Sequence, residues 1–274
     1  MRTSLSKKIA GLLLSLVFVA YVGVCAYYYL YQDSLIFMNR FVPAKEHPEL
    51  KKYNITYEYK GQKINGWQVV YNKNLPTVFY YGGNGERVNE AFVDYQKHYG
   101  SAINFVTFEY PGYGLSTGKP SEIGFIDHQT YATKRFMKEN GISPSKTVFI
   151  GRSMGSSVAT QLAEPLSPAG VILITPFDSI YEIGHRRYPF LPLNMLLKYP
   201  FDSKAVAPRL GMPVLVVEAE NDTVTPIAHA ESLIEAWKGP VRKVFLKEGT
   251  HANIYSYQAL WTQMNDFIRR VTHS

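Results

Sequence analysis

The chain has 274 residues, of which 46% are hydrophobic and 14% aromatic, so it can bury a sizeable core and does not have the composition of a disordered chain. Three of the charges in its formal net charge of +7 come from Arg2, Lys7 and Lys8, and the rest of the sequence has no dense basic run. A nucleic-acid-binding groove usually needs clustered basic residues with interleaved aromatic residues, so we expect no nucleic-acid partner.

The single cysteine, Cys25, excludes an intrachain disulfide and any metal site built from several cysteines. It lies in the apolar N-terminal stretch and is interpreted as a packing residue. A lipid-modified cysteine is the alternative, but Val24 before it is larger than the small residue usual there in a lipoprotein signal.

Residues 9–30 carry no charge, and as a helix they would extend roughly 33 Å, close to the thickness of a bilayer's hydrocarbon core. We therefore predict that residues 1–31 form a cytoplasmic tip and a transmembrane anchor. A signal peptide cut after Ala26 is the alternative, although the apolar core of a signal peptide is usually about 7–15 residues, which is shorter than residues 9–30.

Basic residues precede this span, whereas Tyr27, Tyr28, Tyr29 and Tyr31 lie at its other end and Asp33 is the first charge after it. The positive-inside rule places the N-terminus in the cytoplasm and the rest of the chain on the other side, and the tyrosines match an interfacial aromatic belt. In a bacterium the chain would be an inner-membrane protein facing the periplasm. In a eukaryote it would face a lumen or the exterior.

Beyond the span, strand-like and helix-like segments alternate. A juxtamembrane connector (32–53) precedes a predicted hairpin (54–59 and 63–71). Apolar strands are predicted at 77–81, 102–109, 147–150, 170–174, 214–217 and 244–246, with helices at 88–99, 124–140, 154–163, 227–238 and 254–271. This alternation predicts one doubly wound, mostly parallel α/β domain over 54–274, with a proline-rich cap insertion at about 176–206.

The predicted strand 147–150 leads into a Gly-x-Ser-x-Gly pattern formed by Gly151, Ser153 and Gly155, and a helix-like stretch follows. A serine on such a strand–turn–helix junction projects its hydroxyl above the sheet, and the helix N-terminus favours developing negative charge. We therefore predict that Ser153 is a nucleophile.

A nucleophilic serine needs a base, and the base needs an orienting carboxylate. In this architecture the acid and the histidine follow the serine in that order, each after a later strand. Asp222 follows 214–217 and His251 follows 244–246, so we predict these two. Asp178 is the alternative acid, and His185 in the cap is the alternative histidine.

The oxyanion hole needs two backbone N–H groups. Met154, directly after the nucleophile, is predicted to supply one. The Gly-rich loop after 77–81 is predicted to supply the other, from Asn84 or, failing that, from Gly85. A phosphate-binding interpretation fails because the loop lacks the Lys and Ser/Thr of a nucleotide site.

Together these residues resemble the membrane-anchored α/β-hydrolase-domain proteins related to protein depalmitoylases and lysophospholipid lipases, with a core similar to serine aminopeptidases. The resemblance extends from about Leu35 to the C-terminus. Its motifs are Tyr110-Pro-Gly-Tyr-Gly-Leu-Ser116, Gly118-Lys-Pro-Ser-Glu122, Gly151-Arg-Ser-Met-Gly-Ser156, Pro176-Phe-Asp-Ser179, Phe201-Asp-Ser203 and Asn221-Asp222.

The resemblance implies the α/β-hydrolase fold and carries Ser153, Asp222 and His251 over as a triad. Two positions depart from the family: Gly82-Gly83-Asn84-Gly85 replaces a His-Gly-Asn-Ala loop, and Glu109 replaces an aspartate.

The expected activity is hydrolysis of an acyl ester or thioester, in a small molecule, a lipid or an acylated protein, without a metal or an organic cofactor. One alternative is a serine peptidase, with Glu182 as the cap residue for a substrate amine. A non-catalytic binding protein with this fold is the other.

Overall fold

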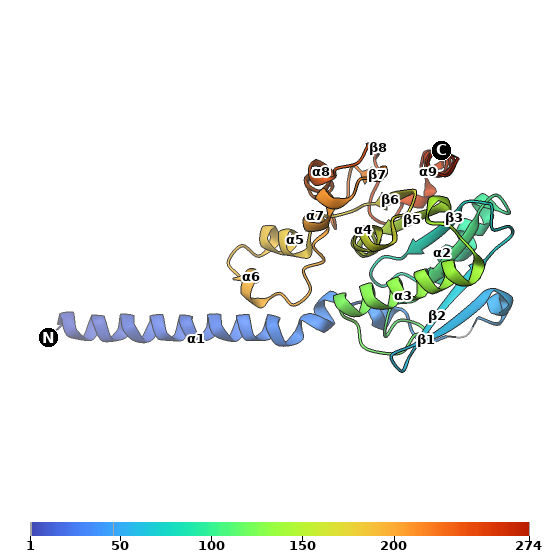
Figure 1. The fold of residues 1–274 in the computed structure, drawn as a ribbon. Coiled ribbons are helices and arrows are strands. Elements are labelled where there is room, and N and C mark those ends of the chain that lie inside the picture. Colours follow the sequence, from blue (N-terminus) through green and yellow to red (C-terminus); the bar gives the residue numbers. More distant parts are fainter. Residues whose placement is uncertain (1, 46, 274) are drawn as a thin grey trace.

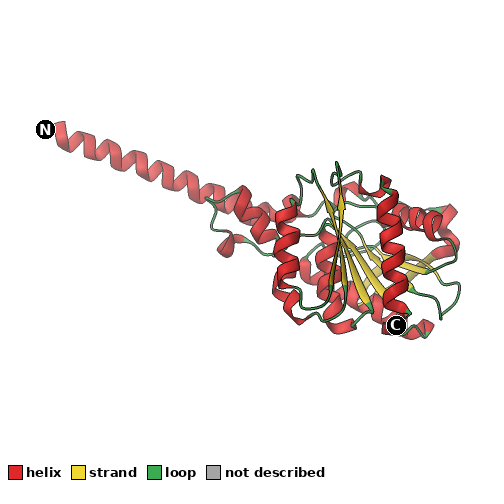
Figure 2. Ribbon diagram, turned by 90° about the horizontal axis from the view of Figure 1, so that it is seen from above, coloured by secondary structure: helices red, strands yellow, loops and turns green. Residues whose placement is uncertain are grey.

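In the computed structural model, which describes residues 2–45 and 47–273, one eight-stranded sheet runs through the body with helices on both faces (Figures 1 and 2). The strand order is β1-β2-β4-β3-β5-β6-β7-β8. The strands are β1 (Asn54–Tyr59), β2 (Gln62–Val69), β3 (Thr77–Tyr81), β4 (Asn104–Phe108), β5 (Thr147–Arg152), β6 (Gly170–Ile174), β7 (Val214–Ala219) and β8 (Val241–Leu246). β1 and β2 form the predicted antiparallel hairpin, β2 pairs antiparallel with β4, and the other strands are parallel.

Two apolar clusters form the core, one on each face of the sheet. One contains side chains of α3 (Glu122–Asn140), α4 (Met154–Leu166) and α8 (Ile227–Ala236). The other contains side chains of α2 (Val88–Tyr99) and α9 (Gln258–Thr272). The central strands β3 to β6 are buried along almost their whole length, as their continuous apolar sequences predict.

Two C-terminal elements differ from the prediction. β8 is an edge strand with alternating burial, and Phe245 is 54% exposed, so the segment 244–246 is not buried on both faces. The last helix begins at Gln258 because 254–256 form a separate 3-10 turn, η5 (Ile254–Ser256).

The N-terminal helix α1 (Arg2–Ile36) projects away from the body (Figures 1 and 2). Its stretch Lys7–Ile36 is long and apolar enough to cross a membrane, with a mean hydropathy of 2.5 in its most apolar part. The helix continues past the predicted span into the segment predicted as a connector. That segment then forms two 3-10 turns, η1 (Asn39–Phe41) and η2 (Pro48–Tyr53).

The chain after α1 packs into the body. The ring of Phe37 is 2% exposed and lies 5.0–5.3 Å, centroid to centroid, from the rings of Tyr199 and Phe125. The end of α1 is therefore held by the same aromatic core that lies beneath the cap.

The cap consists of three short helices between β6 and β7, namely α5 (Ile180–Arg187), α6 (Leu193–Leu196) and α7 (Ser203–Val206), followed by the 3-10 turn η4 (Ala207–Arg209). α6 packs against α1, and Figure 1 shows α5 and α6 beside the body-proximal part of that long helix. The proposed 176–206 insertion thus lies next to α1.

Candidate active site

Ser153 occupies a strained junction between β5 and α4. Its φ of 50° and ψ of −118° lie in a region that non-glycine residues rarely adopt, at a cost on the order of 1–3 kcal/mol. The strain is held by backbone bonds on both sides: the Ser153 N–H donates to Ile174 O at 2.9 Å, and its carbonyl accepts from Ser156 N at 2.8 Å.

The flanking glycines are required by packing. A Cβ on Gly151 would lie 2.2 Å from the Gly155 carbonyl oxygen, and a Cβ on Gly155 would lie 2.0 Å from the Tyr81 carbonyl oxygen. Both distances are far below van der Waals contact. The Gly-x-Ser-x-Gly pattern therefore lets the first turn of α4 pack directly on β5 and on the end of β3.

Asp222 and His251 form a close pair on the loops after β7 and β8. The Nδ1 atom of His251 lies 2.7 Å from Oδ2 of Asp222. The Oδ1 atom accepts the backbone N–H groups of Val224 and Thr225, each at 2.8 Å. Burial acts to raise the pKa of Asp222, but the hydrogen bonds from His251 and from these amides outweigh it and lower the pKa below its ordinary value. Asp222 is thus held as a carboxylate that can orient the imidazole.

The alternative acid and histidine lie elsewhere. Asp178 is buried and pairs with His229 at 2.7 Å, so it does not orient His251. His185 is exposed on α5 and stacks on Tyr181. Among the described residues, Asp178 and His229 thus form a fully buried pair with the same 2.7 Å separation, but the partly buried pair formed by Asp222 is the one that includes the predicted base.

Arg152 connects the strand that carries Ser153 with the loop that carries His251. Its Nη2 donates to the carbonyl oxygen of His251 at 2.8 Å, and its Nη1 lies 3.4 Å from Oε2 of Glu86. Glu86 in turn accepts a hydrogen bond from Tyr80 at 2.7 Å and one from the Gly83 N–H. This network joins the Ser153 junction, the loop that carries His251 and the Gly-rich loop after β3. In the described part of the chain, the Ser153 hydroxyl itself has no hydrogen-bond partner.

Sequence reasoning did not single out Arg152 or Glu86. The available signal was weak: Arg152 is the variable residue of the serine motif, and Glu86 directly follows the Gly-rich stretch. Neither position indicates that the two side chains meet.

The Gly-rich loop lies over the nucleophile. A Cβ on Gly83 would be 3.6 Å from the Cβ of Ser153, and a turn closed by Glu86 N to Gly83 O shapes the loop. This places the predicted oxyanion donors Asn84 and Met154 on the two segments that flank Ser153. Their role as donors stays a prediction.

The side chain of Asn84 is bonded to the chain that leaves α1. Its Nδ2 donates to Ile36 O at 2.5 Å, and its Oδ1 accepts from Met38 N at 2.8 Å and from the Tyr113 hydroxyl at 2.9 Å. A Cβ on Gly85, which has a φ of 75°, would meet Met38 at 3.1 Å. The end of α1 is therefore in direct contact with the loop predicted to supply an oxyanion donor.

Glu109, where the family pattern has an aspartate, is a buried structural carboxyl. It accepts hydrogen bonds from Leu115 N at 2.7 Å and from Asn65 Nδ2 at 3.2 Å. Burial raises its pKa to about 7, although these hydrogen bonds act in the opposite direction.

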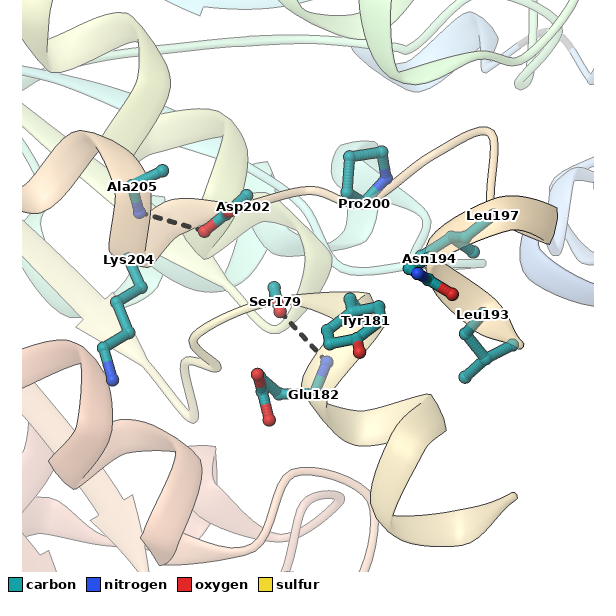
Figure 3. A pocket seen from close by; sticks show the side chains of 10 residues that line it. All are labelled: Ser179, Tyr181, Glu182, Leu193, Asn194, Leu197, Pro200, Asp202, Lys204 and Ala205. Atoms are coloured by element: carbon teal, nitrogen blue, oxygen red, sulfur yellow. Dashed lines mark hydrogen bonds between the residues drawn. The ribbon is translucent and has the colours of Figure 1, made fainter. Parts of the chain in front are cut away.

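A cavity of about 470 Å³ lies within the cap (Figure 3). None of Ser153, Asp222 and His251 lines it. Glu182, the residue considered for a substrate amine, does line it, but Lys204 does so as well, and the backbone N–H of Glu182 is capped by Ser179. Among the described residues, no group of three or more His, Cys, Asp or Glu could hold a metal ion.

A second cavity, of about 370 Å³, lies between α1 and the cap. It shares Leu193 and Leu197 with the first, so the two cavities lie against the same α6 segment. Most of its lining is apolar.

A mostly parallel eight-stranded sheet in this order, with a strained serine between β5 and the following helix, defines an α/β-hydrolase fold. A family described as "Serine hydrolase" matches residues 133–270, and one described as "Alpha/beta hydrolase of unknown function (DUF1057)" matches residues 77–188. The chain belongs to the α/β-hydrolase family of serine hydrolases.

Relatives support this assignment. An uncharacterized protein of Mycobacterium tuberculosis is 32% identical over 187 residues, which are 67% of this chain and 66% of that protein. The human alpha/beta hydrolase domain-containing protein 17B is 24% identical over 192 residues, 69% of this chain and 60% of that protein. The chain thus spans 60–66% of the length of these curated relatives.

Solved structures share the fold at low sequence identity. Est1E of Butyrivibrio proteoclasticus, solved with ferulic acid bound, has a TM-score of 0.68 at 13% identity, covering 80% of this chain and all of that one. The Pyrococcus furiosus esterase Pf2001 has a TM-score of 0.64 at 17% identity, covering 84% and 95%.

Proposed function

We propose that this protein is a membrane-anchored serine hydrolase that cleaves acyl ester or thioester bonds through Ser153, His251 and Asp222. The observation that carries the proposal is the 2.7 Å pairing of His251 with Asp222, on a loop that Arg152, the residue before the strained Ser153, bonds through the His251 carbonyl oxygen. An esterase among the structural neighbours is compatible with acyl chemistry, and the human relative belongs to the family implied by the sequence motifs.

The proposed reaction is a two-step acyl transfer. His251 accepts the Ser153 proton while the serine oxygen attacks the acyl carbon, and Asp222 stabilises the imidazolium that forms. The backbone N–H groups of Met154 and Asn84 would stabilise the oxyanion. The imidazolium then protonates the departing alcohol or thiol. Water, deprotonated by His251, hydrolyses the acyl-enzyme and releases the carboxylic acid, so that Ser153 regains its proton.

The membrane location rests on α1. A helix of this length and hydropathy outside the folded body is suited to spanning a bilayer. Lys7 and Lys8 near its start favour a cytoplasmic N-terminus, which would place the catalytic domain on the opposite side. Substrates would then be acyl compounds, lipids or acylated proteins close to that membrane face.

A covalent probe tests the catalytic assignment. Ser153 in the purified full chain should react with a fluorophosphonate, and the Ser153→Ala protein should not. The wild type should also hydrolyse acyl esters or thioesters, with no turnover by Ser153→Ala. An unreactive Ser153 in folded protein would instead favour a non-catalytic binding protein, and turnover of aminoacyl amides but not acyl esters would favour a peptidase.

A further inference from the structure

The cavity between α1 and the cap is built from two walls of apolar side chains. α1 supplies Tyr28, Leu35 and Ile36, and the cap supplies Ile180, Leu191 and Leu196. Its volume of about 370 Å³ lies at the low end of the range for ligand sites, roughly 300–1,000 Å³. A site of this size suits one acyl chain rather than a whole two-chain lipid.

Gln32, which also lines this cavity, has its polar atoms occupied by backbone groups. Its Nε2 donates to Leu196 O at 2.9 Å and to Tyr29 O at 3.1 Å, and its Oε1 accepts from Lys198 N at 2.8 Å. The side chain is only 5% exposed. Gln32 thus fixes the cap to α1 and leaves no free amide for a polar ligand.

The cap reaches a level of α1 that would lie inside the bilayer. A span of about 20 residues starting at Ile9 ends at Tyr28, roughly 10 Å along the helix beyond Tyr21. The Tyr21 hydroxyl donates to the carbonyl oxygen of Phe190, in the loop between α5 and α6, at 2.8 Å. An unpaired loop carbonyl is costly in hydrocarbon, and this hydrogen bond removes that cost.

The side chains around this loop also suit a membrane boundary. Phe190 and Met195 are 59% and 77% exposed, so the loop presents apolar groups outward. Exposed Arg186 and Arg187 end α5, and the Lys198 ammonium lies 4.4 Å from the centre of the Tyr29 ring. Long basic side chains of this kind reach the polar headgroup region while their stems lie against apolar surroundings.

One residue of the cavity wall contacts the Gly-rich loop, although none of Ser153, Asp222 and His251 lines the cavity. Ile36, in the cavity wall, accepts a hydrogen bond from Asn84 through its carbonyl oxygen. The neighbouring Gly83 lies against Ser153. An acyl chain whose carboxyl end lies at Ile36 would therefore be close to the Gly-rich loop over the nucleophile.

We propose that α1 and the cap together form an acyl-chain site that is filled laterally from the bilayer, with the membrane helix as one wall. This proposal rests on the proposed serine hydrolase function and specifies its substrate as a membrane-embedded acyl compound. The anchor would then be a part of the substrate site as well as a tether.

A size change in the cavity tests the proposal. Leu196→Trp fills the cavity, whereas Met195→Trp makes a comparable addition on the same helix at a position that does not line it. With full-length protein in phosphatidylcholine vesicles, Leu196→Trp should lower kcat/KM for a palmitoyl ester by about tenfold or more. Its effect on kcat/KM for a butyryl ester should be smaller, so that the palmitoyl-to-butyryl ratio falls, whereas Met195→Trp should preserve that ratio. An unchanged palmitoyl-to-butyryl ratio in active Leu196→Trp protein would overturn the proposal.

A second measurement is independent of turnover. The Ser153→Ala protein is placed in vesicles that contain a phosphatidylcholine with a diazirine on its acyl chain, and crosslinking is expected within residues 180–197. Adding Leu196→Trp to this variant should reduce the labelling at least about threefold relative to adding Met195→Trp. Crosslinking confined to residues 9–24 would refute the acyl site even if the enzyme is active. Conversely, loss of the proposed hydrolase function would show as absence of fluorophosphonate labelling and of turnover in the wild type.

Discussion

Asn84 is expected to position the oxyanion loop, and replacing it by alanine tests this directly. Its side chain holds three hydrogen bonds, to Ile36 O, Met38 N and the Tyr113 hydroxyl. Each such bond contributes a net ~0.5–1.5 kcal/mol, so Asn84→Ala removes about 1.5–4.5 kcal/mol of interactions that hold the loop. The substituted residue still has its backbone N–H, but the side-chain bonds that hold this predicted donor in place are lost.

We expect kcat to fall by about 10- to 100-fold, less than the 10²–10³ typical for complete loss of an oxyanion donor. KM should change by less than about threefold, because the affected interaction forms with the transition state rather than with the bound substrate. The assay is steady-state hydrolysis of a short-chain acyl ester by the full-length protein, with the melting temperature measured in parallel.

Two further variants separate positioning from general destabilisation. Tyr113→Phe removes one of the three hydrogen bonds and should give a smaller loss of kcat than Asn84→Ala. Asn89→Ala is a matched control. The Asn89 amide also bonds the segment between α1 and β1, at His47, but it does so from α2 and not from the Gly-rich loop. Asn84→Ala with wild-type kcat, or Asn89→Ala with an equal loss of kcat at equal stability, would refute the positioning role.

Three other predictions follow from the site and its surroundings. Asp222→Asn should lower kcat by about 10⁴-fold, because the His251 imidazole would be held in the wrong tautomer. Asp178→Asn, in the fully buried pair with His229, should leave kcat within about tenfold, and equal losses in ester-hydrolysis assays would contradict the triad assignment. Because the folded-state pKa of Glu109 is raised to about 7, its protonated form favours folding, and this contribution is lost as pH rises from about 4.5 through 7. Glu109→Gln should remove up to about 3 kcal/mol of that pH dependence, and unfolding curves at pH 5 and pH 8 that keep the wild-type difference would disprove it. Gly155→Ala should lower the melting temperature sharply, since the new methyl group would lie 2.0 Å from the Tyr81 carbonyl oxygen, and a wild-type melting temperature would show that the strand end can move.

The central fold could be predicted because its signals are local. β3 and β6 match their predicted bounds, since each is a continuous apolar run buried on both faces. The motif around Ser153 was equally readable as a strand–turn–helix pattern, and the contact that requires Gly151 lies within that unit, whereas Gly155 is required by the Tyr81 carbonyl oxygen at the end of β3.

The edge of the sheet and the end of α1 were less predictable, because packing against distant segments decides which of their residues are buried. β8 lies at the rim of the sheet, so Phe245 is exposed despite its apolar character. The extension of α1 to Ile36 carries Asp33 and Gln32, which resemble an ordinary polar boundary in the sequence. Gln32 is nevertheless buried, because its amide bonds the cap backbone 164 residues away.

The relation between anchor and site was beyond sequence reasoning for the same reason. Tyr21 alone suggests a membrane-helix aromatic residue, and Asn84 alone suggests a loop donor. Only the folded chain brings Tyr21 to Phe190 and Asn84 to the carbonyl of Ile36. Since α1 contacts both the cap and the loop over Ser153, a displacement of the helix would act on the proposed acyl site and on the Gly-rich loop together. Tethering alone would need neither contact, so these contacts are the reason to treat α1 as a functional part of the hydrolase.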